Sequence, residues 1–402
     1  MMEYFSKTTE VPIYRILRHI RELPSEFQKF VFKNLREDQR LDIVDRKLFI
    51  NTYYPLIPSK AFNSLVFALT EASKGHPVPE VVTIAVTHKC PYDCFYCSVP
   101  DKNGEDMPLY KIKETIKNLQ GMGTFIFALT GGEPLLRNDL EDIISCIDER
   151  SIVKLYTTGY GLNLKKASEL KNAGLDSINI ALDNIDKDVH DRIYGVKGAY
   201  ETSLKAIENA KRARLLTCVS TVVTKERIES GEIITFLKYM KKIGVDEVTI
   251  FEPVPTGKVI NETSIILSRS QRKKLNELQK EANKNKEYPR VLSFPYVENK
   301  NFMGCCAGYN RLHITASGEV LPCDFTPLSF GNIISENIED IWKKMHTYFN
   351  KPRESCIMIE NHKKIYESSN GKLPIKLKNT EDIPIDPNIG EIPLFYKKLG
   401  VK

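Results

Sequence analysis

Two hydrophobic periods divide the chain, and the change between them falls near residue 81. Before this point the pattern is helical, because four apolar side chains recur at i, i+3, i+4 and i+7: Ile13, Ile16, Leu17 and Ile20. The stretch from Ala61 to Ala72 predicts a further helix. We expect residues 1–80 to be helical and to pack on the main domain. The alternative is a docking surface for substrate or membrane, since basic amphipathic helices can lie on lipid headgroups.

From residue 81 onward, short β-branched runs alternate with helical stretches. The expected strands are Val81–Thr87, Thr124–Leu129, Val153–Thr158, Ser177–Leu182, Leu216–Val223 and Glu247–Phe251. The expected helices between them lie near 108–121, 138–149, 163–173, 199–213 and 229–242. Strands that alternate with helices predict an α/β fold, with a parallel sheet covered by helices. A curved sheet or partial barrel would place its active site at the carboxyl ends of the strands.

The rhythm changes again after Pro255-Thr256-Gly257. Residues 262–286 are charged and predict a helix, whereas residues 300–356 carry cysteines among glycines, prolines and short strands. The latter pattern predicts a small metal-stabilised domain. Prolines are frequent from residue 363 onward and favour an extended tail. The expected divisions are therefore 1–80, 81–258, 259–362 and 363–402.

Composition narrows the functional classes. The net charge of +6 is spread along the chain, and this argues against a nucleic-acid partner, which usually needs a concentrated basic stripe. No apolar run reaches the roughly 18 residues of a membrane span, and no signal peptide is recognisable, so we expect a cytoplasmic protein. The cysteines number nine, which is odd, and six or seven of them cluster in two loop-like regions, which favours metal ligation over a disulfide framework.

Three cysteines, Cys90, Cys94 and Cys97, follow the first expected strand at spacings of four and three residues. Soft thiolates select zinc or iron–sulfur clusters. A structural zinc site normally has four ligands, and no fourth cysteine or histidine follows at zinc-finger spacing. The segment resembles the C-x3-C-x2-C signature of the radical S-adenosylmethionine (SAM) superfamily, in which an aromatic residue such as Tyr96 often precedes the third cysteine.

This resemblance implies a partial (β/α)6 barrel and a [4Fe–4S] cluster whose open iron site binds SAM. It also implies a reductant of the flavodoxin or ferredoxin type, which would drive cleavage of SAM to a 5′-deoxyadenosyl radical. The cofactor then carries the difficult chemistry, and the protein positions it.

Further motifs fit the same family. Gly131-Gly132-Glu133-Pro134 resembles the GGEP motif that holds the SAM amino group, and a carboxylate can accept from an ammonium group. Thr158 stands where relatives often carry asparagine. Three other residues are further candidates: Asn179 for the SAM ribose, Arg192 for the SAM carboxylate, and Glu252 for substrate binding or proton transfer. For Arg192 an ordinary surface arginine is the alternative, and for Glu252 a structural salt bridge.

A second set of cysteines comprises Cys305, Cys306, Cys323 and Cys356. The order of a cysteine, a short hairpin through Ser317-Gly318 and a cysteine on the returning strand resembles the SPASM/twitch extension of radical SAM enzymes. That resemblance implies one auxiliary [4Fe–4S] cluster, with either Cys305 or Cys306 in its ligand set. The alternative is a zinc-bound or thiol-only domain.

The sequence therefore predicts a radical SAM enzyme that abstracts hydrogen from a substrate. Such extensions are frequent among enzymes that modify ribosomally made peptides, so peptide or protein maturation is the leading hypothesis. The alternatives are the same chemistry on a small molecule or lipid, with the N-terminal helices in peripheral contact with a membrane, and a non-catalytic iron–sulfur electron carrier.

Overall fold

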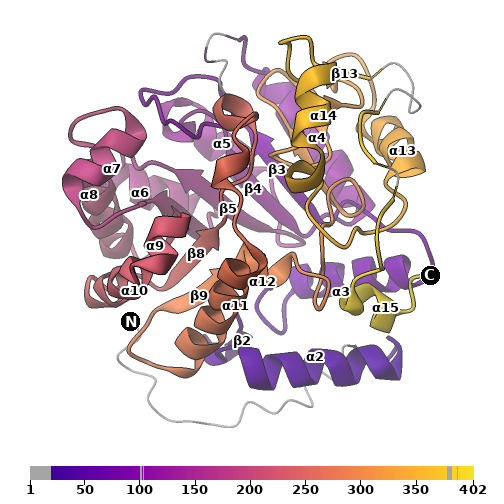
Figure 1. Ribbon diagram of the computed structural model, residues 1–402, viewed down its shortest axis with the longest axis horizontal. Coiled ribbons are helices and arrows are strands. Elements are labelled where there is room, and N and C mark those ends of the chain that lie inside the picture. The colour runs from indigo at the N-terminus through magenta and orange to yellow at the C-terminus, as the bar shows by residue number, and fades with distance from the viewer. Residues whose placement is uncertain (1–19, 100–101, 103, 378–382, 387) are drawn as a thin grey trace.

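A single nine-stranded sheet organises the computed structural model (Figure 1). The structure describes residues 20–99, 102, 104–377, 383–386 and 388–402. The strand order in the sheet is β11-β10-β3-β4-β5-β6-β7-β8-β9. Neighbouring strands from β10 to β9 are parallel, and only the β10–β11 pair is antiparallel. The helix expected at Ile13–Ile20 falls, except for its last residue, outside the described part.

The six strands expected from the sequence are all present in the centre of this sheet. They are β3 (Val81–Ala85), β4 (Ile126–Thr130), β5 (Ile152–Thr157), β6 (Ser177–Ala181), β7 (Leu216–Val222) and β8 (Glu247–Phe251). Strands β4 to β7 are almost continuously apolar or buried, as expected of strands covered on both faces. The α/β fold class with a parallel sheet is confirmed.

The five expected crossover helices are also present. They are α4 (Leu109–Met122), α5 (Leu140–Ser145), α6 (Leu164–Asn172), α8 (Ala199–Arg212) and α10 (Glu232–Lys242). Two short helices were not predicted, namely α7 (Lys187–Tyr194) and α9 (Lys225–Glu229). In α7 the Asp186 carboxylate caps the first turn and Gly195 ends the helix in the left-handed region.

The sheet continues past residue 258, where the sequence predicts a new domain. Helix α11 (Arg269–Lys284) starts at a capping box formed by Ser268 and Gln271, and it leads to β9 (Arg290–Ser293), parallel to β8. On the other edge, β10 (Arg311–Ile314) pairs with β3 and then turns into β11 (Val320–Leu321). The barrel and the cysteine-rich segment thus share one sheet, and the boundary at 258 stays a prediction.

The remaining elements belong to short connections and to the C-terminal part. They are the 3-10 turns at Pro134–Leu136, Gly257–Val259 and Thr263–Ile265, then α12 (Phe294–Val297), β12 (Leu328–Ser329), α13 (Ile338–Tyr348), α14 (Ile357–Ser368), β13 (Ile375–Lys376) and α15 (Leu394–Leu399). The extended tail predicted for 363–402 is wrong at both ends of that range, because α14 continues to Ser368 and α15 is helical. The buried side chains of Phe395, Tyr396 and Leu399 explain why α15 docks.

The N-terminal region forms a second apolar core under the sheet. Helices α2 (Ser25–Asp38) and α3 (Lys60–Ser73) pack with α15, and the three lie together at the bottom of Figure 1. The prediction of an all-helical region is wrong, because β1 (Asp42–Val44) and β2 (Lys47–Phe49) form a hairpin. Its turn residues, Asp45 and Arg46, adopt positive φ without the usual Asn-Gly signal.

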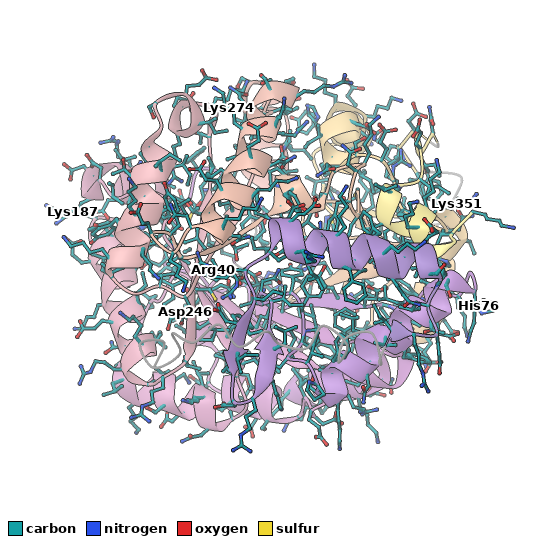
Figure 2. The ribbon with its side chains drawn as sticks, turned by 90° about the horizontal axis from the view of Figure 1, so that it is seen from below. Arg40, His76, Lys187, Asp246, Lys274 and Lys351 are labelled. Atoms are coloured by element: carbon teal, nitrogen blue, oxygen red, sulfur yellow. The ribbon has the colours of Figure 1, made fainter. Side chains whose placement is uncertain are left out.

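The view from below shows how this region is fastened to the barrel (Figure 2). Arg40, just after α2, donates to the carbonyl oxygen of Ala282 in the last turn of α11, at 3.0 Å, and to that of Tyr288, between α11 and β9, at 3.1 Å. A guanidinium that binds several carbonyls fixes one orientation of the two segments. Among the described helices, none combines the length and the apolar character needed to cross a bilayer.

Candidate active site

The first cysteine loop follows β3 and is tied to α7. The backbone N–H groups of Asp93 and Phe95 donate to the carbonyls of Tyr194 and Ile193, at 3.0 and 3.2 Å. All three thiols of Cys90, Cys94 and Cys97 are partly buried. Burial, followed by the neighbouring thiols of Cys97 and Cys90, raises the pKa of the Cys94 thiol to about 12. The sequence spacing therefore brings the three sulfur atoms within electrostatic reach of one another.

Three soft thiolate donors in one loop fit an iron–sulfur cluster. Within the described residues, no three His, Cys, Asp or Glu side chains gather closely enough to hold one metal ion. A cluster spreads its thiolate ligands over several iron atoms. A bound metal also keeps a coordinating thiol deprotonated, which offsets the raised pKa of Cys94.

The Gly131-Gly132 turn lies directly against the backbone of the cysteine loop. The Gly132 N–H donates to the Thr87 carbonyl at 2.8 Å, and the Glu133 N–H donates to the Lys89 carbonyl at 2.7 Å. A Cβ atom on Gly132 would lie 2.3 Å from the Lys89 carbonyl oxygen, and one on Gly131, whose φ is +146°, would lie 2.6 Å from that of Thr87. Both glycines are therefore required for the two loops to touch.

Glu133 is fully buried behind this turn, and Pro134 starts the short 3-10 turn that follows it. Its carboxylate accepts from the Thr157 hydroxyl at 2.5 Å, from the Leu135 N–H at 3.0 Å and from the Thr158 N–H at 2.8 Å. The Thr158 hydroxyl donates to the same group. Burial raises the pKa of Glu133, and the threonine donors oppose that shift. Thr158, which replaces the usual asparagine, thus holds Glu133 at the carboxyl end of β5.

Tyr96 is anchored by Asp183, a residue that the sequence analysis did not select. The Tyr96 hydroxyl donates to the Asp183 carboxylate, which also accepts from the Val222 N–H at 2.6 Å. Burial, followed by the negative charge of Asp183, raises the pKa of Tyr96 well above its ordinary value. Asp183 lies in the Leu-Asp-Asn stretch after β6, where the resemblance to the family could have singled it out.

The other three candidates occupy quite different surroundings. Asn179 is fully buried on β6, and its amide Nδ2 has no hydrogen-bond partner among the described residues. Arg192 is exposed in the last turn of α7. Glu252 forms an ion pair with Arg272 of α11, with 2.7 Å between Oε2 and Nε, and it lines neither cavity described below. Burial raises the pKa of Glu252, and Arg272 opposes that shift.

The second set of cysteines separates into three and one. Backbone hydrogen bonds of 2.8 and 2.9 Å join Cys305 to Arg353, which brings Cys305 beside the start of α14 at Cys356. Burial, followed by the neighbouring Cys305 thiol, raises the pKa of Cys323 to about 12. Burial also raises the pKa of Cys356, and the neighbouring thiols of Cys305 and Cys323 contribute to that rise. The thiols of these three residues therefore form one group.

Cys306 lies apart from that group although it follows Cys305 directly. Its sulfur atom lies 3.2 Å from the hydroxyl oxygen of Tyr396 on α15, in the apolar core under the sheet. Cys306 lines the cavity on that side, whereas the other three cysteines line a different cavity. Adjacent side chains on an extended backbone point in opposite directions, which explains the separation.

The catalytic cavity, as we call the space lined by the three thiols, also reaches the first cysteine loop. It has a volume of about 190 Å³, and its wall includes Ser98, next to Cys97, and Thr130, next to Gly131. Aromatic side chains make much of the remaining wall: Tyr53, Tyr156, Phe251, Phe294 and Phe325. The cavity therefore extends from the three thiols of the second set to the end of the first cysteine loop, beside the carboxyl ends of β4 and β8. This is the edge of the sheet at which α/β folds place their active sites.

Paired charges complete this wall. Arg311 donates to Glu298 at 2.8 Å, and Asp324 lies 3.3 Å from His313 Nδ1. Tyr53, Glu298 and Arg311 were not selected from the sequence. Tyr53 belongs to the N-terminal region, where no motif surrounds it, so only the three-dimensional arrangement identifies it as a wall residue.

Comparisons with known proteins agree with this geometry. A sequence profile described as the radical SAM superfamily matches residues 84–237, and one described as an iron–sulfur cluster-binding domain, SPASM, matches residues 305–364. A probable GTP 3′,8-cyclase of Sulfolobus acidocaldarius is 33% identical over 260 residues, covering 61% of this chain and 80% of that protein. A PqqA peptide cyclase of Granulibacter bethesdensis is 26% identical over 270 residues, covering 64% of this chain and 72% of that protein.

Among solved structures, Streptococcus suis SuiB bound to the precursor peptide SuiA has a similar fold. The TM-score is 0.59 at 15% sequence identity, and the match covers 78% of each chain. Fold, cysteine sets and sequence relatives together define an iron–sulfur enzyme that uses SAM. The chain belongs to the radical SAM superfamily and carries a C-terminal SPASM domain.

Proposed function

We propose that this enzyme abstracts a hydrogen atom from a substrate held in the catalytic cavity, and that the substrate is a peptide or protein. In this proposal Cys90, Cys94 and Cys97 hold the SAM-binding cluster. Cys305, Cys323 and Cys356 hold the auxiliary cluster. When reduced, the first cluster with bound SAM supplies a 5′-deoxyadenosyl radical. The observation that supports the proposal is the cavity lined by Cys305, Cys323 and Cys356, which extends to Ser98 beside Cys97.

The protein groups around the first cysteine set have defined tasks in this proposal. The Gly131-Gly132 turn and Glu133 form the surface that would face the amino group of SAM, since Glu133 is an acceptor held at one place by Thr157 and Thr158. Asn179 has a free amide donor for the ribose. Asp183 fixes Tyr96 beside the cysteine loop. The surroundings of Arg192 and Glu252 do not support the roles expected for them, because Arg192 is exposed and Glu252 is paired with Arg272.

The size and charge of the catalytic cavity favour a peptide side chain. A cavity of about 150 Å³ can hold a benzene ring, so a volume of about 190 Å³ admits one ring-sized group. Two carboxylates, Glu298 and Asp324, and one guanidinium, Arg311, line it among the described residues. This balance disfavours a substrate with several phosphates, because desolvated like charges repel strongly. A neutral side chain of a longer peptide fits better.

The second candidate is the same chemistry on a small molecule. It is favoured by the likeness to the GTP 3′,8-cyclase, which is 33% identical, whereas the peptide cyclase is 26% identical. The family membership sets the electron-carrier alternative aside. A lipid substrate, peripheral membrane contact, a flavodoxin-type reductant and a cytoplasmic location all stay predictions.

The first experiment tests the assignment of the SAM-binding cysteines. Anaerobically reconstituted protein with dithionite should convert SAM to 5′-deoxyadenosine and methionine. Replacing Cys90, Cys94 and Cys97 by alanine should abolish this conversion and remove about half of the iron, leaving the auxiliary cluster. Undiminished cleavage by the triple variant would show that the assignment is wrong.

The second experiment tests the substrate class. Peptide and nucleotide fractions are prepared from cells that lack the protein, and each is added to the reconstituted enzyme with SAM. We expect the peptide fraction to stimulate deoxyadenosine formation and to yield a peptide of changed mass. The Cys323→Ala variant is the matched control, and it should still cleave SAM but form no product. Stimulation by the nucleotide fraction alone would establish the small-molecule alternative instead.

A further inference from the structure

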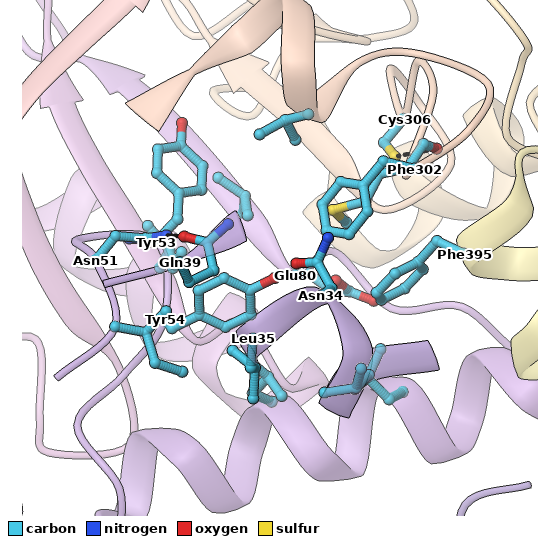
Figure 3. A pocket seen from close by; sticks show the side chains of 18 of the residues that line it. Asn34, Leu35, Gln39, Asn51, Tyr53, Tyr54, Glu80, Phe302, Cys306 and Phe395 are labelled. Carbon is cyan, nitrogen blue, oxygen red and sulfur yellow. Dashed lines mark hydrogen bonds between the residues drawn. The ribbon is translucent and has the colours of Figure 1, made fainter. Parts of the chain in front are cut away.

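A second cavity, the basal cavity, lies under the sheet on the far side of the catalytic wall. Helices α2, α3, α12 and α15 and the amino ends of β3 and β4 enclose about 110 Å³ (Figure 3). Phenylalanines dominate its lining: Phe27, Phe30, Phe62, Phe125, Phe302 and Phe395. The two cavities share only Tyr53, Val81, Phe294 and Arg311, so the basal cavity is a separate space.

Glu80 is the exceptional residue in this apolar wall. Its side chain is only 4% exposed, and its Oε1 atom has no hydrogen-bond partner among the described residues. The backbone holds it in place, because its N–H donates to the Asn310 carbonyl at 2.7 Å and its carbonyl accepts from Phe125 at 3.1 Å. A buried, unpaired carboxyl oxygen is unfavourable, so a native structure that keeps one calls for an explanation.

A trapped water molecule explains Glu80 poorly. A buried water needs two to four polar partners, and several polar groups of this lining are already engaged. The Asn34 amide donates to the Tyr296 hydroxyl at 2.6 Å, and Arg311 donates to Glu298. The Cys306 thiol lies against the Tyr396 hydroxyl. Apolar side chains make most of the wall, and the Glu80 carboxyl, which bonds to the Asn310 side chain, keeps Oε1 as a free acceptor there.

We propose that the basal cavity binds a small amphiphile, a short alkyl group that carries a primary amine, with the amine donating to Glu80 Oε1. A volume of about 110 Å³ is smaller than the cavity of about 150 Å³ that holds a benzene ring, so it limits the apolar part to a short alkyl chain. An ammonium group that donates to a carboxylate forms a charge-assisted hydrogen bond, which is strong where water is excluded. Arg311 is the positively charged side chain that acts on Glu80, and its ion pair with Glu298 offsets its charge. This inference does not rest on the proposed function.

Calorimetric titration of the full-length, cluster-loaded enzyme with n-pentylamine and pentan-1-ol tests the proposal. The titration is made at pH 8, above the value of about 7 to which burial raises the pKa of Glu80. We expect one amine molecule to bind per chain. Glu80→Gln should lower the affinity for the amine by at least about tenfold and change the affinity for the alcohol little. The exposed control Glu262→Gln should leave both affinities unchanged.

A second variant locates the site independently of Glu80. Val31→Phe places extra volume at a partly exposed position of the wall. It should lower the affinity for the amine and the affinity for the alcohol to a similar extent. Unchanged SAM cleavage in both variants confirms that they fold. Three results would each overturn the proposal: no amine binding by the parent enzyme, equal amine affinity in Glu80→Gln, or full affinity in Val31→Phe.

Discussion

The contact between the glycine turn and the cysteine loop can be tested by adding one methyl group. In Gly132→Ala the new Cβ would lie 2.3 Å from the Lys89 carbonyl oxygen, whereas ordinary contact begins at 3.4 Å. The obstacle is backbone, so no side-chain rotation can relieve it. The cysteine loop would have to move by about 1 Å, and the hydrogen bonds from Gly132 to Thr87 and from Glu133 to Lys89 would stretch.

The cost of this change follows from those contacts. Overpacking typically costs about 1–3 kcal/mol, and each lost hydrogen bond adds about 1 kcal/mol. With both hydrogen bonds lost, the sum is about 3–5 kcal/mol. It acts on the loop that carries Cys90 and leaves the strands unaffected. A displacement of about 1 Å at a reacting centre can lower the rate by about 100-fold. We therefore expect Gly132→Ala to fold, to lose iron and to cleave SAM at least about 100-fold more slowly.

Iron content and deoxyadenosine formation are measured on reconstituted protein, with thermal unfolding as a check on the fold. Gly121→Ala is the matched control, because Gly121 lies in α4 with no atom within 4 Å of its added Cβ. Alanine is favoured in a helix by about 0.5–1 kcal/mol, so this control should be slightly more stable and fully active. Full iron content and cleavage within about twofold of the parent in Gly132→Ala would refute the reasoning.

Three further predictions concern the remaining candidates. Iron analysis should show that Cys305→Ala loses about half of the iron and Cys306→Ala almost none, because of the two only Cys305 lines the same cavity as Cys323. Equal losses in the two variants would contradict this ligand set. Glu252→Gln should cost about 1–3 kcal/mol in urea unfolding, because Arg272 loses its ion pair, and should leave the ratio of product to deoxyadenosine unchanged. Burial raises the pKa of Glu80 from 4.5 to about 7, so the folded state holds the proton more tightly and the free energy of unfolding should fall by up to about 3 kcal/mol between pH 4.5 and pH 7. Denaturant unfolding across this range should show a shallower decline in Glu80→Gln, and identical profiles would refute the assignment.

The sequence predicted the barrel well because each central strand is short, β-branched and separated from the next by an amphipathic helix. It predicted the hairpin of β10 and β11 through Ser317-Gly318, but neither β9 nor the pairing of β10 with β3 in the barrel sheet. Arg290 and Arg311 interrupt their apolar pattern, and each is accommodated only by a tertiary partner, Asp42 and Glu298. The hydrophobic periodicity of the sequence does not reveal those partners, because they lie far from Arg290 and Arg311 or on other elements.

The cysteine motifs identified the residues that face the cofactors, but they could not separate Cys305 from Cys306. The position of α15 distinguishes the two residues, because Tyr396 on that helix contacts the Cys306 thiol in the apolar core under the sheet. The proline-rich composition that predicted an extended tail concealed this helix. The missing information was tertiary, since three buried apolar residues of α15 become meaningful only beside α2 and α3.

The wall of the catalytic cavity shows why motifs define the cofactor better than the substrate. Lys154, fully buried on β5, donates to the Thr52 hydroxyl at 2.8 Å and lies 4.1 Å from the centre of the Tyr53 ring. The Thr52 hydroxyl in turn donates to Glu247 at 2.5 Å. A buried lysine and glutamate inside the barrel thus fasten a segment of the N-terminal region, because each charge needs a partner there.

That segment places Tyr53 between the catalytic and the basal cavity, where it lines both. Motif residues such as Gly131 and Glu133 follow the carboxyl end of β4, whereas Tyr53 belongs to no family motif. Because Tyr53 lines the catalytic cavity, we expect the N-terminal region to contribute to the choice of substrate.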